Sequence, residues 1–241
     1  MIDLHSHILP ALDDGALDLA DSLAMARVAE LDGIAVVCAT PHIRSDHDVR
    51  IEQLPERVAE LQRELDRHGV NVRIAQGGEV SALMAGDLSD EHLRAVSLDG
   101  GGWILLEPAP GPLDDELPVL VRRLSERGAR TIVAHPERHA GADFEQRLIA
   151  LASGGCLIQW TADFIAQRDA GDPDDPVLRL AREGLVHLLA SDAHSSHGGR
   201  PLRLSAGFER LAAVCPPEHV RWIAQDAPAA IMRGEHVVPP W

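Results

Sequence analysis

Short apolar runs alternate with longer amphipathic stretches along most of the chain. Each apolar run spans only a few residues, is partly β-branched and is often bounded by Gly, as is typical of buried strands. Seven strands are predicted on this basis: Ile2–His5, Ile34–Ala39, Val72–Ala75, Trp103–Glu107, Thr131–Ala134, Cys156–Gln159 and His187–Ala190.

The stretches between these runs carry apolar residues at helical spacing. Leu17–Leu31 shows this spacing and is followed by Gly33, a common helix stop. Gln53–His68 places its leucines on one face and stops at Gly69. Further helices are predicted at Leu117–Arg127, Phe144–Ser153, Pro176–Glu183, Leu204–Val214 and Glu218–Ala224. The segment Asp87–Gly102 is the least regular part of the chain.

Strands that alternate with helices predict an α/β fold with a parallel sheet, either closed into a barrel or open and doubly wound. No internal repeat, linker or low-complexity tract marks a boundary, so residues 1–241 are expected to form a single domain. The first residues contain no basic segment ahead of an apolar stretch, and no apolar run is long enough to span a bilayer. We therefore expect a cytoplasmic protein that is not inserted in a membrane.

Charge and composition exclude several kinds of chemistry. The formal net charge of −16 argues against a nucleic acid partner, because such proteins need a basic surface. All 22 basic residues are Arg, so lysine nucleophiles, Schiff bases and carbamylated-lysine metal sites are excluded. The three cysteines are far apart and odd in number, which indicates reduced thiols.

Two segments match the Cys-x5-Arg spacing of cysteine-dependent tyrosine phosphatases, one starting at Cys38 and one at Cys215. That mechanism needs a loop of free backbone N–H groups around the phosphate. Pro41 removes such a donor from the first segment, and Pro216 and Pro217 remove two from the second. Cysteine catalysis is therefore rejected.

Polar residues recur where the predicted strands end, at the edge on which parallel α/β folds build their active sites. His5 and His7 are alternate residues of one strand end, so both imidazoles point the same way. Each motif alone is more often structural than catalytic. Together they supply five histidines and four carboxylates: His5, His7, Asp14, His42, Glu79, Glu107, His135, Asp192 and His194.

Imidazoles mixed with hard oxygen ligands, without a thiolate, suit manganese in the first place, with iron or zinc as alternatives. Nine ligands are too many for one ion and fit two or three. Four carboxylates and three divalent ions would leave a charge of about +2 to meet a phosphate dianion. The residues therefore predict a metal-dependent phosphoester hydrolase.

The order of these residues resembles the PHP (polymerase and histidinol phosphatase) superfamily, and more narrowly its bacterial capsule-biosynthesis tyrosine phosphatases. The similarity runs from residue 1 to about residue 215 and is carried by Met1-Ile2-Asp3-Leu4-His5-Ser6-His7-Ile8, Leu12-Asp13-Asp14-Gly15, Ala39-Thr40-Pro41-His42, Gly78-Glu79, Leu105-Leu106-Glu107, Ala134-His135-Pro136-Glu137-Arg138 and Ser191-Asp192-Ala193-His194. It implies a distorted seven-stranded (β/α)7 TIM-like barrel. It also implies a phosphotyrosine protein as substrate, in particular a membrane-associated tyrosine kinase of polysaccharide export.

The resemblance further implies a distribution of the ligands over three ions. His5, His7, Glu79 and Asp192 would hold the first; Glu79 would bridge to a second held by Glu107 and His135; and Asp14, His42 and His194 would hold the third. The chain departs from the family's usual pattern at His139 and Trp160. Both are expected near the pocket, where they would bear on substrate preference.

A water bridging two of the metals is the expected nucleophile, attacking phosphorus in line. Arg138 and Arg200 are the candidates for binding the non-bridging oxygens, because a guanidinium fork matches phosphate geometry. A phenolate leaves readily, so no general acid is assigned, although His47, His139 and His197 are candidates for lying nearby.

Two other functions remain open. A small-molecule phosphatase such as a histidinol phosphatase would use the same ligands with a tighter pocket, and an inactive metal-binding regulatory module would keep the metals without turnover. An amidohydrolase fits the length and the extra acids less well. The remaining histidines are expected at the surface or at helix ends: His68, His92, His187, His219 and His236.

Overall fold

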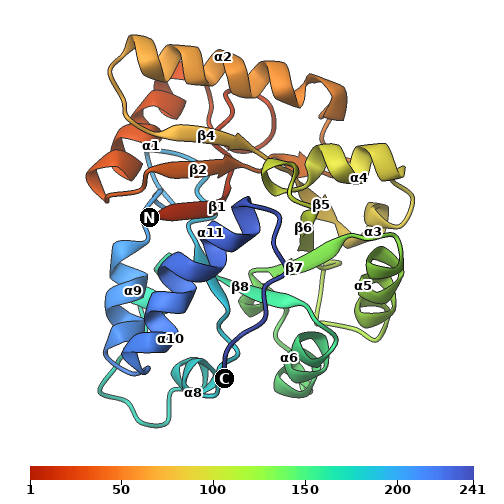
Figure 1. Cartoon of the computed structure of the whole chain (residues 1–241). Helices are drawn as coiled ribbons and strands as arrows, with labels where there is room; N and C mark the ends of the chain where they lie inside the picture. Colours follow the sequence, from red (N-terminus) through yellow and green to blue (C-terminus); the bar gives the residue numbers. More distant parts are fainter.

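The computed structural model describes all 241 residues and consists of parallel strands surrounded by helices (Figure 1). The strands are β1 (Ile2–Ser6), β2 (Val36–Ala39), β3 (His42–Ile43), β4 (Arg73–Gln76), β5 (Glu79–Ser81), β6 (Trp103–Glu107), β7 (Arg130–Ala134), β8 (Leu157–Thr161) and β9 (Leu188–Ala190). They form a three-stranded sheet of order β1-β2-β4 and a six-stranded sheet of order β3-β5-β6-β7-β8-β9, and all pairs are parallel.

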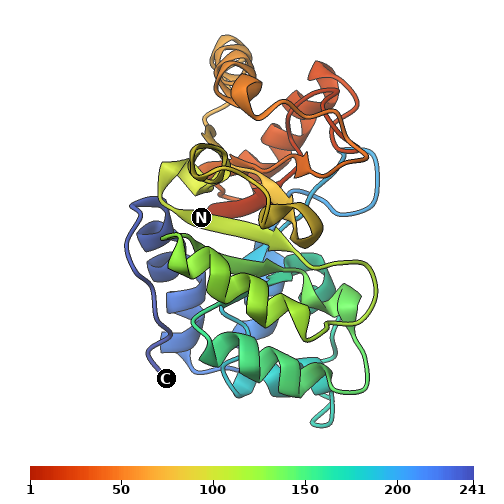
Figure 2. The same cartoon turned by 90° about the vertical axis from the view of Figure 1, so that its right-hand side faces the viewer.

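Helices follow most of the strands. They are α1 (Leu19–Leu31), α2 (Leu54–Arg67), α3 (Ala82–Ala85), α4 (Asp90–Val96), α5 (Glu116–Glu126), α6 (Phe144–Ser153), α7 (Ala162–Ala166), α8 (Pro176–Arg182), α9 (Ser205–Ala212), α10 (Pro217–Arg221) and α11 (Ala227–Met232). In Figure 1, α1 and α2 lie beside β2 and β4, whereas α5 and α6 lie beside β7 and β8. The view in Figure 2 shows the same helices covering the outside of the strands. None of the helices combines the length and the apolar content that crossing a bilayer requires.

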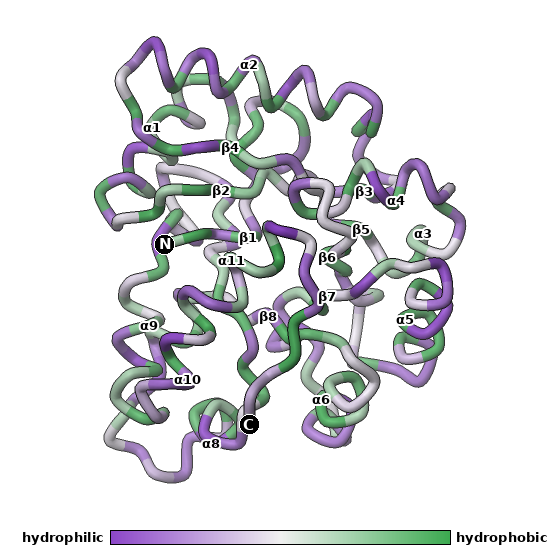
Figure 3. The backbone as a smooth tube through the Cα atoms, in the orientation of Figure 1, coloured by the Kyte–Doolittle hydropathy of each residue, from purple (hydrophilic) through white to green (hydrophobic).

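Alternate residues of the strands face two different apolar clusters, as the two-residue period of a strand requires. One cluster of 48 buried residues packs between the strands and the outer helices. A second cluster of 13 takes one or more residues from each of β1, β2, β4, β6, β7, β8 and β9 and is extended by Ala227 and Ile231 of α11. Figure 3 shows apolar colours along β2 and polar colours on much of the outer helix α2. The strands therefore surround a common apolar interior.

The two sheets meet at short interruptions that the sequence explains. Thr40 and Pro41 separate β2 from β3, and Pro41 has no N–H to continue a ladder. Gly77 and Gly78 separate β4 from β5, and a Cβ on Gly78 would lie 2.9 Å from the Ile43 side chain. On the other side, the backbone N–H of His7 donates to the Ala193 carbonyl (2.8 Å), which links the end of β1 to the segment after β9.

The prediction of a mixed α/β fold with parallel strands is confirmed. All seven predicted strands are present, Trp103–Glu107 with the same ends and the other six with shifted ends. The predicted count is wrong, because β3 and β5 form two further strands after the interruptions. Every predicted helix overlaps an observed one. The irregular segment Asp87–Gly102 nevertheless contains α4, whose N-terminus is capped by the Ser89 side chain, and the short helices α3, α7 and α11 were not predicted.

Candidate metal centre

The nine predicted ligands converge at one edge of the strands. Four groups of His, Asp or Glu side chains have ligand atoms within 4.8 Å of one another. They are His7 with Asp14, His42 and His194; His5 with His135 and Asp192; His5 with His7 and Glu79; and His42 with Glu79 and Glu107. Together the four groups contain all nine residues and no other. This convergence follows from the parallel order, because every strand delivers its carboxyl end to the same edge.

Glu79 lies at the centre of the cluster. It opens β5, directly after the two glycines, and is fully buried. Its Oε2 lies 3.2 Å from His5 Nε2 and 3.1 Å from His7 Nε2, and its Oε1 lies 2.6 Å from His135 Nε2. One carboxylate thus faces imidazoles from several strands, a position suited to bridging two cations.

A second part of the cluster lies closer to solvent. The Oδ1 of Asp14 is 3.4 Å from His42 Nε2 and 3.5 Å from His194 Nε2. The side chain of Asp14 is 55% exposed, so this part is open to small molecules from outside. The ring of His7 stacks on that of His194 with centroids 3.9 Å apart and so joins the outer part to the buried one.

Two residues of the cluster have strained backbones. His135, directly after β7, has φ 29°, and Asp192, two residues after β9, has φ 50°. L-residues other than Gly rarely adopt positive φ, and such strain persists mainly where the surroundings enforce it at functional sites. Here the torsions turn both side chains into the cluster, where His5 Nε2 lies 3.3 Å from Asp192 Oδ1.

The donor set fits divalent cations. Four buried atoms in the cluster make no hydrogen bond of good geometry: His42 Nδ1, Glu79 Oε2, His135 Nδ1 and Asp192 Oδ1. Burial alone would raise the pKa of Glu79, but the imidazoles of His5 and His135 outweigh it and hold that pKa well below its usual range. Burial acts to lower the pKa of His7, yet hydrogen bonds to Asp13 and Glu79 raise it to about 10. The cluster therefore attracts positive charge and leaves buried acceptors for it, as buried carboxylates require.

Several residues that the sequence did not single out hold the cluster in place. Asp13 has one oxygen 2.7 Å from His7 Nδ1, and the same oxygen accepts the backbone N–H of His42 (2.9 Å). Gln159 Oε1 lies 2.9 Å from His5 Nδ1. These contacts fix which ring nitrogen of His5 and His7 faces Glu79. Asp13 stands next to Asp14 in the sequence, and a turn of two acids gives no local signal of which one points inward.

The buried carboxylate of Asp3 supports the same edge. It accepts hydrogen bonds from the hydroxyl (2.5 Å) and the backbone N–H (3.0 Å) of Ser191 and from the backbone N–H of His5 (3.3 Å). Burial raises the pKa of Asp3 to about 6 against these hydrogen bonds. Asp3 thus ties β1 to the segment that carries Asp192. Asp3 alternates with His5 and His7 in the sequence, and this spacing indicates a side chain on the same side of the strand as the two imidazoles.

The two predicted arginines both reach Asp192. Arg138 lies in the short turn after β7 and forms an ion pair with the Asp192 carboxylate. Arg200 donates from Nε to the Asp192 carbonyl (2.6 Å) and lies 3.2 Å from its carboxylate. A third guanidinium that the sequence did not single out, Arg44, lies 3.3 Å from Glu107 Oε1. Cationic side chains thus flank the cluster on two sides.

An open cleft of about 510 Å³ borders the cluster on the side of Glu107 and His135. Arg44, Arg138 and His139 also line it, which places His139 at the pocket as expected. The prediction for Trp160 is wrong. That indole is fully buried in the core, donates to the Leu185 carbonyl (3.1 Å) and packs against phenylalanines.

The structure also bears on the remaining cysteines and histidines. Cys38, Cys156 and Cys215 are free and buried, and burial raises the pKa of each thiol. This agrees with the rejection of cysteine catalysis, because the thiolate is the nucleophile. The prediction that His187 lies at the surface is wrong. It is buried, and its Nδ1 accepts the backbone N–H of Ile158 (3.0 Å).

Comparison with known proteins places these features in context. Residues 1–233 match the family model "Capsular polysaccharide synthesis, CpsB/CapC". The tyrosine-protein phosphatase YwqE of Bacillus subtilis is 32% identical over 199 residues, covering 81% of this chain and 78% of that protein. The tyrosine-protein phosphatase CpsB of Streptococcus pneumoniae is 23% identical over 242 residues, covering 98% and 99%.

Solved structures give the same picture. A structure from work on YwqE of Bacillus subtilis and CpsB of Streptococcus pneumoniae, described as metal-dependent tyrosine phosphatases, aligns with a TM-score of 0.84 and 27% identity. The alignment covers 99% of this chain and 96% of that one. A TatD homologue from Escherichia coli aligns with a TM-score of 0.51 at 14% identity, covers 96% of this chain and 97% of its own, and is similar in fold alone.

Proposed function

Because this chain belongs to the CpsB/CapC family of capsular polysaccharide synthesis, we propose that it is a metal-dependent protein-tyrosine phosphatase. The observation that carries the proposal is the cluster around Glu79, which combines buried carboxylate oxygens surrounded by imidazoles with arginines at its rim. Such a site offers cations to the phosphoryl oxygens, and the burial of all three thiols argues against the cysteine mechanism. The relatives named as tyrosine-protein phosphatases support the same reaction.

The cluster would hold two or three divalent ions, with manganese in the first place. Glu79 would bridge two of them, and the outer group of Asp14, His42 and His194 would hold a third. The absence of thiolates and the mixture of imidazole with carboxylate support this choice of metals. When bound, the ions would supply Lewis-acid charge and an acidified water as the nucleophile.

The residues of this chain then have distinct tasks. Asp13 and Gln159 hold the imidazoles of His7 and His5 in one tautomer, with Nε2 turned toward Glu79. Arg138 and Arg200 would bind the non-bridging oxygens of the phosphate, since both lie at the rim beside Asp192. A phenol has a pKa of about 10 and leaves readily as phenolate, so the site needs no strong general acid.

The proposed substrate is a phosphotyrosine on a protein of the capsule machinery, in particular a membrane-associated tyrosine kinase reached from the cytoplasm. The relatives named tyrosine-protein phosphatases and the open cleft beside Glu107 support a protein substrate. The fold would be a distorted barrel in which β1 and β9 close the two sheets. The hydrogen bond between His7 and Ala193 and the shared interior cluster support this closure.

Metal removal tests the reaction class. A chelator should abolish hydrolysis of a phosphotyrosine peptide, manganese should restore it, and iodoacetamide should leave it unchanged because all three thiols are buried. Loss of activity on alkylation of Cys38 or Cys215 in the folded protein would contradict the metal mechanism.

A small-molecule phosphatase is the second candidate, since it would use the same ligands. Comparing kcat/KM for a phosphotyrosine peptide and for histidinol phosphate on the metal-loaded enzyme separates the two. The open cleft predicts that the peptide is the better substrate. A kcat/KM for histidinol phosphate that is higher by orders of magnitude would contradict the tyrosine phosphatase function. If neither substrate is hydrolysed, the inactive metal-binding regulatory module is the function that remains.

A further inference from the structure

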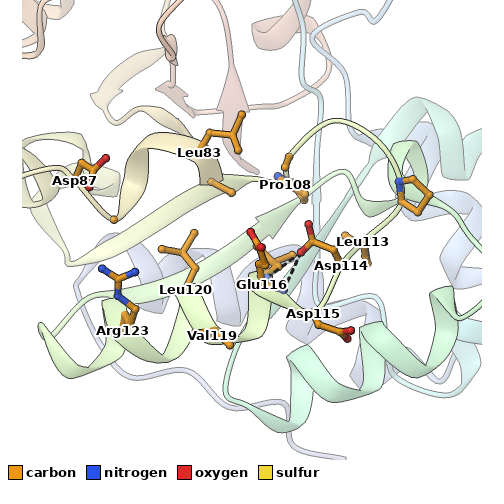
Figure 4. Close-up of a pocket in the computed structure, with 15 residues that line it drawn as sticks. Leu83, Asp87, Pro108, Leu113, Asp114, Asp115, Glu116, Val119, Leu120 and Arg123 are labelled. Carbon is orange, nitrogen blue, oxygen red and sulfur yellow. Dashed lines mark hydrogen bonds between the residues drawn. The ribbon is translucent and has the colours of Figure 1, made fainter.

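A second cavity, of about 420 Å³, adjoins the metal-bearing edge between α3 and α5 (Figure 4). The side chains of Leu83, Pro108, Leu113, Val119 and Leu120 supply its apolar lining. Leu83 is 70% exposed and Val119 is 47% exposed, which is unusual for apolar residues that face one another in a hollow. Leu83 and Val119 do not belong to the apolar core of the fold, so their exposed side chains are available to a partner.

The cavity is continuous with the cleft beside the cluster. Leu83 and Pro108 line both hollows. Pro108 directly follows Glu107, the last residue of β6, and Leu83 lies in α3, the helix that follows the strand of Glu79. The chain segments that carry two proposed metal ligands therefore run on into the walls of the second cavity. If the phosphotyrosine of a protein substrate lies at the metals, the residues next to it in the substrate would reach the second cavity.

Charge at the rim specifies the partner further. In Figure 4, Asp87 and Arg123 lie at one end of the cavity, and Asp114 and Glu116 lie toward the other. The side chains of Asp87 and Glu116 form no ion pair within the chain, and Asp115, which also lines the cavity, is paired with Arg147. Acidic groups thus outnumber the single Arg123. An unpaired acidic rim around an apolar hollow favours a partner with both an apolar and a basic side chain.

We propose that this cavity is a substrate subsite that binds an apolar side chain, accompanied by a basic one, close to the phosphotyrosine of the protein substrate. The inference rests on the proposed phosphatase function and deepens it, because it assigns sequence preference to a surface outside the metal cluster. The acidic rim disfavours an anionic membrane as the occupant. Continuity with the cleft favours the substrate over a second copy of the chain.

Peptide kinetics test the subsite. The metal-loaded enzyme is assayed on phosphotyrosine peptides in which one Leu and one Arg are moved through the positions on either side of the phosphotyrosine, with an all-Ala peptide as reference. We expect one placement to raise kcat/KM roughly tenfold, mainly through KM, as for an apolar group that fills a pocket. L83S and V119S should both remove this preference, and V119S, whose side chain lines the cavity but not the cleft, should hydrolyse p-nitrophenyl phosphate at the wild-type rate.

L31S is the matched control, because Leu31 is 88% exposed at the end of α1, and it should keep the preference for Leu. D87N combined with E116Q should remove the preference for Arg and leave that for Leu. Equal kcat/KM for all peptides on an active enzyme would overturn the subsite. So would a change from dimer to monomer in L83S without an effect on peptides, because the surface would then join two copies of the chain. An enzyme that hydrolyses neither peptide nor p-nitrophenyl phosphate would contradict the phosphatase function itself.

Discussion

Replacing Asp13 by Asn tests whether the cluster depends on the carboxylate that supports His7. The side chain of Asp13 is 1% exposed, and its Oδ1 accepts the backbone N–H of Gly15 (3.0 Å) while Oδ2 faces His7 and His42. An amide in the same place has only one acceptor. If its oxygen keeps the contacts to His7 and His42, its NH2 group meets the N–H of Gly15, and one buried hydrogen bond is lost.

The expected size follows from these contacts. The variant loses the hydrogen bond from the Gly15 N–H and the negative charge of the acceptor that faces His7, and a hydrogen bond to a charged group contributes about 1.5–3 kcal/mol. Removal of a residue that orients a metal-bound His typically lowers metal affinity or activity by about 10–100-fold, which corresponds to about 1.4–2.7 kcal/mol. The two routes agree, so we expect D13N to bind manganese about 10–100-fold more weakly than the wild type.

The assay is a competition titration of manganese against a chromophoric chelator, followed by kcat/KM at saturating metal. D18N is the matched control, because Asp18 caps α1 through the backbone N–H of Asp21 (2.9 Å) and does not contact the cluster. It should keep the cap of α1, because Asn caps a helix as well as Asp does, and it should leave metal affinity unchanged. Wild-type metal affinity in D13N, or an equal loss in D18N, would refute the role of Asp13.

Three further predictions address stability, metal binding and phosphate binding. Burial lowers the pKa of His187 to about 4, so the unfolded chain binds a proton at this residue near pH 5 that the folded chain does not bind; urea unfolding should show that the wild type loses about 2 kcal/mol of stability relative to H187Q between pH 7.5 and pH 5. Saturation with manganese at about 100 times its Kd should stabilise the protein by about 2.7 kcal/mol, seen as a melting temperature higher by roughly 5–10 °C; no shift with any divalent ion would contradict the metal site. R138A should lower kcat/KM for a phosphotyrosine peptide by about 10–100-fold at unchanged metal content, and R138K should recover only part of it; full activity of R138A would exclude this residue from phosphate binding.

Much of the fold was predictable, because the determining signal is local. Runs such as Trp103–Glu107 alternate between two apolar environments, and their composition reveals a strand without knowledge of its neighbours. The short strands β3 and β5 escaped prediction because two or three residues after Pro41 or Gly78 carry no measurable period. The helix α3 escaped for the same reason.

The candidate site divides in the same way. Because residues that end parallel strands meet at one edge, the sequence determined which residues gather there, as His5, Glu107 and His135 illustrate. Only the tertiary structure decided how they are arranged. It decided that Glu79 faces several imidazoles, and that of two adjacent acids Asp13 points inward and Asp14 outward.

The same distinction explains the two wrong predictions about single side chains and the unexpected cavity. The side chains of His187 and Trp160 carry polar atoms, and burial of such atoms requires a hydrogen-bond partner. His187 is bonded to the Ile158 N–H and Trp160 to the Leu185 carbonyl, and both partners come from other parts of the chain. The hollow beside Leu83 exists because α3 and α5 leave a gap there. The local sequence shows which positions are polar or apolar and the period with which they recur. Which groups meet depends on the packing of segments far apart in the chain, and that packing is a property of the whole fold.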